Sequence, residues 1–296
     1  MTRYAIVGGG GQLGQALAAQ QPGHAVPLTR QQADLTANIA DLTGGLLSVG
    51  PLAGVINCAA YTQVDKAETA TADCQAVNAA GVEKLAEICQ RQDWLLVQLS
   101  SDYVFNGTVD RNVPFIETDL PTPQGVYARS KLAGEQAARA APRHLVIRTC
   151  GLYGKLRQPG HANFVETILR VAAQRPNLRV VADQHCTPSW VEDIAAAIWF
   201  LVLNEQALRA AGDWPNLLHI VNQGATTWHE VALRIVQLSG LETTVEPIST
   251  AEYGAPAPRP AYSVLDTGLY QQLVTKYGGP PLPTWDAALE QYWQTR

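Results

Sequence analysis

The sequence is poor in cysteine and has no long apolar run. Its 296 residues include five cysteines, an odd number without a Cys-x-x-Cys spacing, which argues against a disulfide framework and a zinc site. We therefore predict buried, reduced thiols and no bound metal. No apolar stretch reaches the length of a membrane span, and the opening lacks the features of a signal peptide, so a cytoplasmic protein without a membrane partner is expected. The cysteines are Cys58, Cys74, Cys89, Cys150 and Cys186.

Blocks of like charge are also missing. Charged residues make up 16% of the chain and the net charge is −5, which disfavours a surface for nucleic acid or anionic lipid. A bound phosphate must then be held by local features of the fold. The hydrophobic share of 47% is ordinary for a folded protein, and the length suits either one large α/β unit or two modest domains.

The first half alternates short apolar runs with helical patterns. The runs are apolar on both faces, and such runs are typical of parallel strands covered by helices on both sides. The sequence therefore predicts an α/β protein with a Rossmann-type, doubly wound parallel sheet. The runs are "YAIVG", "AGVINCAA", "WLLVQLSS" and "HLVIRTCGLYG".

The second half is less regular. "NFVETILRVAAQ" predicts an amphipathic helix, "LRVVAD" and "LLHIVNQG" predict strands, and "WVEDIAAAIWFLVLNEQAL" predicts one long apolar helix that packs back on the sheet. We predict a dinucleotide-binding domain over residues 1–154, with about 190–225 returning to it, and a smaller C-terminal substrate-binding lobe mainly over 155–296. The site is expected between the lobes, at the carboxyl ends of the strands.

"YAIVGGGGQLGQAL" places glycines between the first strand and a helix. The spacing fits G-x-x-G-x-x-G through Gly8, Gly11 and Gly14, and equally G-x-G-x-x-G starting from Gly9. Glycines at such a turn let backbone N–H groups approach a pyrophosphate at the helix N-terminus. We predict a dinucleotide cofactor here.

The end of the second predicted strand carries Thr29 and Arg30 where an acid often binds the ribose hydroxyls. Arg30 suits a 2′-phosphate, which favours NADPH, with NADH as the alternative; a solvated surface charge is the other interpretation of Arg30. Asp34, with Leu35, follows at a position better placed for the adenine edge.

Two further features lie downstream. Ser100 and Ser101 end an apolar run, where a hydroxyl can either meet a ligand or cap the next turn. Tyr127 and Lys131 are four residues apart and share one helix face. A neighbouring ammonium is expected to lower the pKa of the phenol towards the working range of an acid–base catalyst. The spacing alone also occurs by chance on surface helices.

Together the glycine turn, the strand-end hydroxyl and the Tyr–Lys pair resemble the short-chain dehydrogenase/reductase superfamily, in its extended branch that acts on nucleotide sugars. Within that branch, the ordered motifs resemble the dTDP-4-dehydrorhamnose reductase family over nearly the whole chain. These motifs include "GGGGQLG", "VINCAAYTQVDKAE", "SSDYVFNG", "VYARSKLAGE", "ADQHCTPSWVEDIA", "HIVNQGATTWHEVA" and "RPAYSVLD".

The resemblance implies NADPH-dependent reduction of the C4 ketone of dTDP-4-dehydro-L-rhamnose to dTDP-L-rhamnose, the last step of dTDP-rhamnose synthesis, by a monomer or homodimer. It implies Tyr127 as proton donor, Lys131 as its partner and ribose ligand, and Ser101 as carbonyl ligand, where the family usually has Thr. Cofactor residues implied are Gly8, Gly11, Gln12, Leu13, Gly14, Arg30, Asp34, Leu35, Ala59, Ala60, Tyr61, Thr62, Tyr127 and Lys131. Substrate residues implied are Val64, Ser101, Asp102, Phe164, Gln184, Pro188 and Arg259.

The sequence departs from the family pattern at three places, two of which bear on sugar specificity. Gly151 stands where many members carry Trp, which removes an aromatic group from the expected sugar pocket, and Cys186 stands where Gly is usual. No acid follows Gly14 immediately, so a metal-bridged dimer has no support. Two other hypotheses stay open: a non-catalytic regulatory subunit like that of methionine adenosyltransferase, and another nucleotide-sugar reductase, epimerase or dehydratase, since these share the fold.

Overall fold

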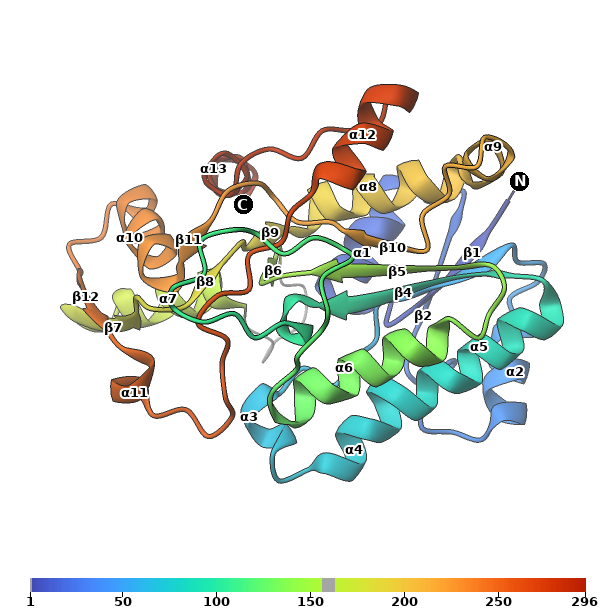
Figure 1. Ribbon diagram of the computed structural model, residues 1–296, viewed down its shortest axis with the longest axis horizontal. Helices are drawn as coiled ribbons and strands as arrows, with labels where there is room; N and C mark the ends of the chain where they lie inside the picture. The colour runs from blue at the N-terminus through green and yellow to red at the C-terminus, as the bar shows by residue number, and fades with distance from the viewer. Residues whose placement is uncertain (1, 156–162) are drawn as a thin grey trace.

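A six-stranded parallel sheet forms the centre of the computed structural model, which describes residues 2–155 and 163–296 (Figure 1). The strand order is β10-β5-β4-β3-β1-β2, so the chain moves outward from β1 to β2 and then crosses to β3 on the other side of β1. The crevice at such a reversal is where doubly wound sheets bind ligands. The predicted doubly wound fold is confirmed. The strands are β1 (Tyr4–Val7), β2 (Ala25–Leu28), β3 (Gly54–Asn57), β4 (Leu95–Ser101), β5 (His144–Thr149) and β10 (Leu217–His219).

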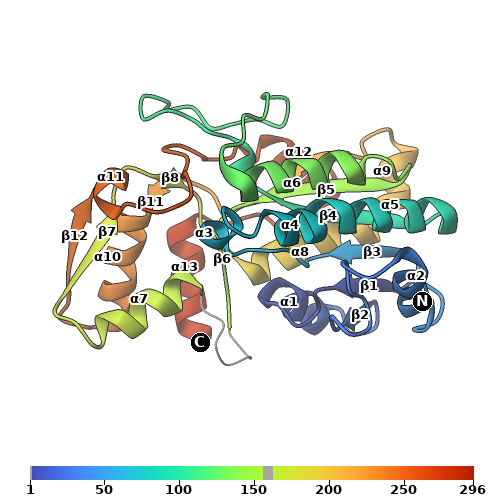
Figure 2. The same cartoon turned by 90° about the horizontal axis from the view of Figure 1, so that it is seen from below.

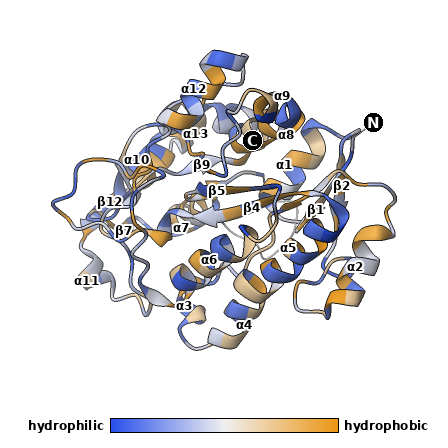
Figure 3. Cartoon of the chain, turned by 45° about the vertical axis from the view of Figure 1, so that its right-hand side comes forward, coloured by the Kyte–Doolittle hydropathy of each residue, from blue (hydrophilic) through white to orange (hydrophobic). Residues whose placement is uncertain are grey.

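Each strand contributes side chains to two separate cores, because successive residues point to opposite faces of the sheet. Tyr4 and Ile6 pack on the side of α1 and α8, whereas Ala5 and Val7 pack on the side of α2 and α5. Helices α5 and α6 show both hydrophilic and hydrophobic residues, as expected for helices covering a sheet (Figure 3). No helix in the described residues is long and apolar enough to cross a bilayer. These helices are α1 (Gln12–Gln20), α2 (Ile39–Leu47), α5 (Gly81–Gln92), α6 (Gly125–Ala138) and α8 (Val191–Leu203).

A second lobe lies beyond the carboxyl ends of β4 and β5, at the end of the molecule away from the N-terminus (Figures 1 and 2). It contains a two-stranded parallel sheet of β7 (Asn177–Val181) and β12 (Thr244–Ile248). Helices α7 (Phe164–Ala172) and α10 (Trp228–Ser239) pack on each other and on this sheet.

The remaining elements are short or connect the two lobes. They are α3 (Val64–Ala67), α4 (Thr71–Gln75), the π-helix η1 (Ala76–Ala80), the 3-10 helix η2 (Asp102–Val104), β6 (Leu152–Tyr153), β8 (His185–Cys186), β9 (Ser189–Trp190), α9 (Glu205–Ala210), β11 (Thr226–Thr227), α11 (Thr250–Tyr253), α12 (Gly268–Tyr277) and α13 (Trp285–Thr295).

The chain crosses between the lobes more than once. After β7 it returns through α8, which packs on α1, and through β10, which pairs with β5 at the edge of the large sheet. The single long helix expected over this stretch is instead two helices, α8 and α9, separated at Asn204. The Asn204 Nδ2 donates to the carbonyl O of Phe200 at 2.8 Å, so its side chain competes for a helix carbonyl group.

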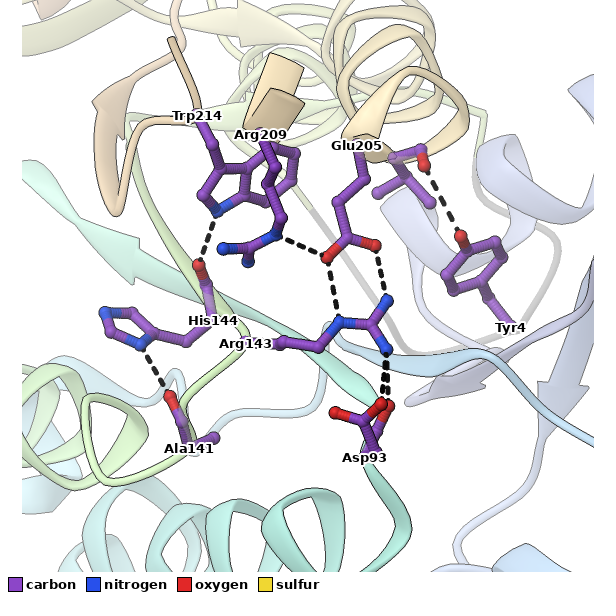
Figure 4. A network of polar contacts seen from close by, with 9 residues as sticks. Tyr4, Asp93, Ala141, Arg143, His144, Glu205, Arg209 and Trp214 are labelled. Atoms are coloured by element: carbon purple, nitrogen blue, oxygen red, sulfur yellow. Dashed lines mark hydrogen bonds and ion pairs between the residues drawn. The ribbon is translucent and has the colours of Figure 1, made fainter. Parts of the chain in front are cut away.

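Helix α9 is fastened to the amino-terminal ends of β4 and β5, opposite the edge that faces the second lobe. Glu205 accepts hydrogen bonds from Arg143, which precedes β5, and from Arg209 (Figure 4). Arg143 also donates to the carbonyl O of Asp93, which precedes β4. These contacts hold the amino-terminal ends of β4 and β5 in place. The carboxyl ends of these strands remain for the site.

Candidate active site

The glycines after β1 form a tight turn into α1. Gly8 has φ +79°, and a Cβ on it would lie 2.7 Å from the backbone N of Ala59. A Cβ on Gly14 would lie 2.5 Å from the carbonyl O of Gly8. Within the described residues no side chain caps α1 at Gly11, so its first N–H groups and helix dipole are available to an anion. The turn fits the pyrophosphate of a dinucleotide.

The first two residues of α1 make different contacts. The Gln12 Oε1 accepts a hydrogen bond from Asn163 Nδ2 at 2.8 Å, which ties α1 to the residue capping α7. The Leu13 side chain is buried in the core beside α8, so only its main chain can face a cofactor.

Arg30 and Asp34 stand just beyond the end of β2. The Arg30 Nε donates to Asp34 Oδ2 at 3.1 Å, and the Arg30 side chain is 78% exposed. Burial acts to raise the pKa of Asp34, but hydrogen bonds from Thr36 and Arg30 hold it below its ordinary value. The side chain of Leu35 packs in the core, so the exposed Arg30–Asp34 pair is the part of this segment that is open to a ligand.

The loop after β3 carries Ala59, Ala60, Tyr61 and Thr62 and is held by Asn78 on the π-helix. The Asn78 side chain accepts from the backbone N of Tyr61 at 2.8 Å and donates to the Tyr61 carbonyl O at 3.1 Å. It also donates to Ser130 Oγ at 3.0 Å, next to Lys131 on α6. The Tyr61 hydroxyl has no hydrogen-bond partner among the described residues, so a ligand group or a water molecule can bind it.

Tyr127, Lys131 and Ser101 meet where α6 passes the carboxyl end of β4. The buried Lys131 Nζ donates to the carbonyl O of Leu99 at 2.7 Å. Ser101 is the last residue of β4, and its hydroxyl is within hydrogen-bonding reach of Tyr127. The arrow tips of β4 and β5 point from this place toward the second lobe (Figure 1). The structure therefore brings the three predicted catalytic side chains together at one edge of the sheet.

The pKa values of the pair differ from the expectation. Burial raises the pKa of Tyr127 above its usual range, and the hydrogen bond with Ser101 lowers it only in part. Burial also lowers the pKa of Lys131, to about 8. The expected lowering of the Tyr127 pKa is therefore wrong for this structure, because desolvation raises it. Tyr127 is a protonated phenol at neutral pH.

Asp102 lies behind Ser101 rather than open to a substrate. It is 2% exposed, accepts from Ser101 Oγ at 3.0 Å and from Ser263 Oγ at 2.6 Å. Burial raises its pKa, while the bonds from Ser263, Cys150 and Ser101 oppose that rise. These contacts give Asp102 the role of orienting the Ser101 hydroxyl.

A cavity of about 710 Å³ lies in the second lobe. Phe164, Gln184 and Arg259, all expected near the substrate, line it. Tyr103 and Trp228 line it as well, and the Tyr103 ring meets the Tyr127 ring edge to face with centroids 5.8 Å apart. Tyr103 therefore contacts both the cavity and Tyr127.

Asp65 and Arg259 form an ion pair at one side of this cavity. The Arg259 Nη1 and Nη2 each donate to a different oxygen of Asp65, both at 2.9 Å. The bonds from Arg259 lower the pKa of the Asp65 carboxyl. The pair joins α3 to the segment before Tyr262, and Val64 precedes Asp65 as the half-buried first residue of α3.

The ring of Trp228 lies beside Gly151, where a side chain on residue 151 would need space. Its φ is +51°, and a Cβ on it would lie 2.8 Å from Trp228 Cη2 and 3.2 Å from the Cα of Pro188. The Trp228 ring also packs on Phe164, with centroids 4.6 Å apart. The aromatic surface missing at position 151 is thus supplied by α10.

The sequence interpretation missed four residues: Tyr103, Trp228, Asn78 and Glu135. Tyr103 follows the strand-end hydroxyls directly, and Trp228 follows Thr227, whose capping box with Glu230 begins α10. Glu135 continues the four-residue spacing of Tyr127 and Lys131 along α6. Asn78 had no comparable signal, because its partners are distant in the sequence.

Comparison with known proteins identifies the family. The family described as "RmlD substrate binding domain" matches residues 2–296. A dTDP-4-dehydrorhamnose reductase of Mycolicibacterium smegmatis is 38% identical, over 97% of this chain and 84% of its own. The enzyme of the same name from Bacillus anthracis, solved in complex with NADP, superposes with a TM-score of 0.86 at 32% identity and complete coverage of both chains. That from Clostridium acetobutylicum gives 0.88 at 30% identity, covering 99% of each chain. The chain belongs to the dTDP-4-dehydrorhamnose reductase family.

Proposed function

We propose that this protein reduces the C4 ketone of dTDP-4-dehydro-L-rhamnose with NADPH and releases dTDP-L-rhamnose, the last step of dTDP-rhamnose synthesis. The observation that carries the proposal is the meeting of Tyr127, Lys131 and Ser101 at the carboxyl end of β4. The family relationship supports the same chemistry.

NADPH, when bound, supplies the hydride that adds to C4 of the sugar. The turn through Gly8, Gly11 and Gly14 would hold its pyrophosphate, because that backbone leaves room that a side chain would fill. Arg30 would face the 2′-phosphate end, and the loop with Tyr61 the inner half. The other proposed cofactor contacts come from the main chain of five residues, with Asp34 and Leu35 at the adenine end. The five residues are Gln12, Leu13, Ala59, Ala60 and Thr62.

The ketone oxygen gains negative charge during the reduction and needs a proton. Tyr127 is suited to donate it, because burial keeps its phenol protonated at neutral pH. The Ser101 hydroxyl can donate to the same oxygen when its proton, which now goes to Asp102 Oδ1, turns towards the substrate. Lys131 carries positive charge beside Tyr127 and favours the phenolate that remains after the transfer.

The second lobe is the proposed binding surface for the dTDP-sugar. Phe164, Gln184 and Trp228 offer an apolar and amide-lined wall, with Pro188 behind Gly151. Arg259 is the proposed diphosphate ligand because a guanidinium binds phosphate through two parallel bonds. The Arg259 guanidinium now donates both bonds to the Asp65 carboxylate. When the substrate binds beside Val64, we expect Arg259 to bind both this carboxylate and the diphosphate.

We further infer the domain division from the order of elements: a dinucleotide-binding unit over residues 1–154, joined by about 190–225, and a substrate lobe mainly over 155–296. Five free cysteines suit a reducing compartment, so we propose that the enzyme works in the cytoplasm. A net charge of −5 argues against a nucleic-acid partner. A monomer or a homodimer is the proposed assembly.

The test is to follow NADPH absorbance with dTDP-4-dehydro-L-rhamnose as substrate. One NADPH oxidised for each dTDP-L-rhamnose formed supports the reductase. An epimerase would instead hold NAD tightly and cause no net oxidation. A regulatory subunit would show no turnover alone and would co-purify with an enzyme partner. The second and third outcomes would each refute the proposal.

A further inference from the structure

Helix α6 carries a third polar residue in line with the catalytic pair. Tyr127, Lys131 and Glu135 recur every four residues, which places them on one face of the helix. That face meets consecutive residues of β4: Lys131 Nζ binds the Leu99 carbonyl O, and the next residue, Ser100, binds Glu135.

The Glu135 carboxylate is fully buried and fully bonded. Its Oε1 accepts from Ser100 Oγ at 2.6 Å and from Arg148 Nε at 2.8 Å, and its Oε2 accepts from Arg148 Nη2 at 2.8 Å. The Glu135 and Arg148 side chains are 0% and 1% exposed. One carboxylate therefore joins α6 to both β4 and β5, directly behind Ser101.

Burying such a pair is not an efficient way to stabilise a fold. Desolvation of two charges offsets most of their attraction, and well-packed apolar residues of similar volume are often as stable. The pair lies one helical turn from Lys131, and this position indicates instead that the pair acts on Lys131.

The surroundings of Lys131 have opposing effects on the pKa of its amine. Burial disfavours the ammonium and lowers the pKa of Lys131, while Glu135 on α6, Cys74 on α4 and Cys58 after β3 act in the opposite direction. Glu135 is the first of these opposing groups, and its two bonds from Arg148 and one from Ser100 hold the carboxylate in place.

We propose that Glu135 is a positioning residue for the reduction: it fixes α6 against β4 and keeps the amine of Lys131 charged beside Tyr127. This inference rests on the proposed function, in which Lys131 assists proton donation. Glu135 itself touches neither cofactor nor substrate.

The first experiment compares Glu135→Gln with Ser100→Ala. Both remove contacts of the same carboxylate, but only Glu135→Gln removes its charge. We expect the upper pH limb of kcat/KM, set by loss of the Lys131 proton, to move down by about one pH unit in Glu135→Gln. It should stay in place in Ser100→Ala, and KM for the sugar should change less than about threefold in both, since neither side chain reaches the cavity.

The second variant guards against a failure of Glu135→Gln to fold. Glu135→Leu with Arg148→Met removes both charges and keeps an apolar core of similar volume, so the double variant is expected to fold. Its pH limb should also move down. A folded double variant with the wild-type limb would overturn the proposal, because the pair would then serve packing alone.

A nitrogen NMR titration of Lys131, assigned with Lys131→Met, separates this inference from the proposed function because it needs no substrate. We expect the Lys131 amine to lose its proton at lower pH in Glu135→Gln than in the wild type. Equal titration in the two proteins refutes the role of Glu135, whatever reaction the enzyme catalyses. Absence of NADPH oxidation in the wild type would refute the reductase instead.

Discussion

The ring of Trp228 lies where a side chain on Gly151 would stand, 2.8 Å from the position of its Cβ. Gly151 follows the end of β5, whose residue Thr149 pairs with Ser101 on β4. The Trp228 ring therefore packs on the segment that follows β5 and forms part of the wall of the cavity.

Gly151→Ala should weaken binding of the nucleotide sugar. The methyl group would displace the Trp228 ring, and φ of +51° strains any residue with a Cβ. We expect KM for the sugar to rise about tenfold, equivalent to about 1.4 kcal/mol, with KM for NADPH unchanged. Steady-state kinetics with each substrate varied in turn measures this. Gly278→Ala is the matched control, because Gly278 also has positive φ, at +73°, but has open space around it. A similar change in both variants would show that backbone strain alone is responsible.

Tyr127→Phe should abolish turnover and spare NADPH binding. The variant loses the proton donor but keeps the ring that packs on Tyr103, so kcat should fall by roughly 100-fold or more. Fluorescence titration with NADPH checks the binding. Tyr103→Phe keeps the same edge-to-face contact without touching the donor, and its kcat should stay within a few fold of the wild type. Substantial turnover in Tyr127→Phe would remove Tyr127 from the mechanism.

Gly14→Ala should prevent cofactor binding. Its methyl group would lie 2.5 Å from the Gly8 carbonyl O and would push α1 away from the turn. NADPH should then neither bind nor raise the thermal midpoint of the variant. Gly44→Ala on α2 is the control: nothing lies within 4 Å of its Cβ, and it should stabilise the protein by about 0.5–1 kcal/mol. Thermal melts with and without NADPH compare the two, and an NADPH-dependent shift in Gly14→Ala would contradict the proposed pyrophosphate site.

His219 should make the fold sensitive to acid. Burial, and then the charge of Arg148, lower its pKa from 6.5 to about 3. Below pH 6.5 the unfolded chain binds a proton that the folded protein refuses, so the free energy of unfolding falls as pH falls towards 3. The slope from this group approaches about 1.4 kcal/mol per pH unit.

His219→Gln is the variant that tests this, because it cannot titrate. Its free energy of unfolding should fall less steeply than that of the wild type between about pH 6 and pH 4, measured by urea denaturation. Parallel curves for the wild type and His219→Gln would contradict the prediction.

The elements that were predictable from the sequence are those with local signals. Apolar runs identified the parallel strands, and Gly8, Gly11 and Gly14 located the turn into α1, because periodicity and glycine spacing are local properties. The break at Asn204 was missed, since the apolar pattern continues across it and the side-chain bond from Asn204 to Phe200 gives no periodic signal.

Contacts between distant segments were harder to foresee. The pairing of Glu135 with Arg148, of Asp65 with Arg259, and the packing of Trp228 on Gly151 each depend on where the fold brings two strands or loops. The raised pKa of Tyr127 also depends on contacts between distant segments. Sequence spacing gives the distance to Lys131, whereas burial depends on residues from β4, η2 and α4.

Strand β10, which completes the large sheet against β5, is made only after α7 and β7 of the second lobe. A growing chain that has not yet reached residue 217 leaves the edge of β5 without its partner, and α1 without the cover of α8 until that helix has formed. The lobe built on the large sheet therefore completes its folding only after part of the second lobe has been made, and it is not expected to become a stable intermediate by itself.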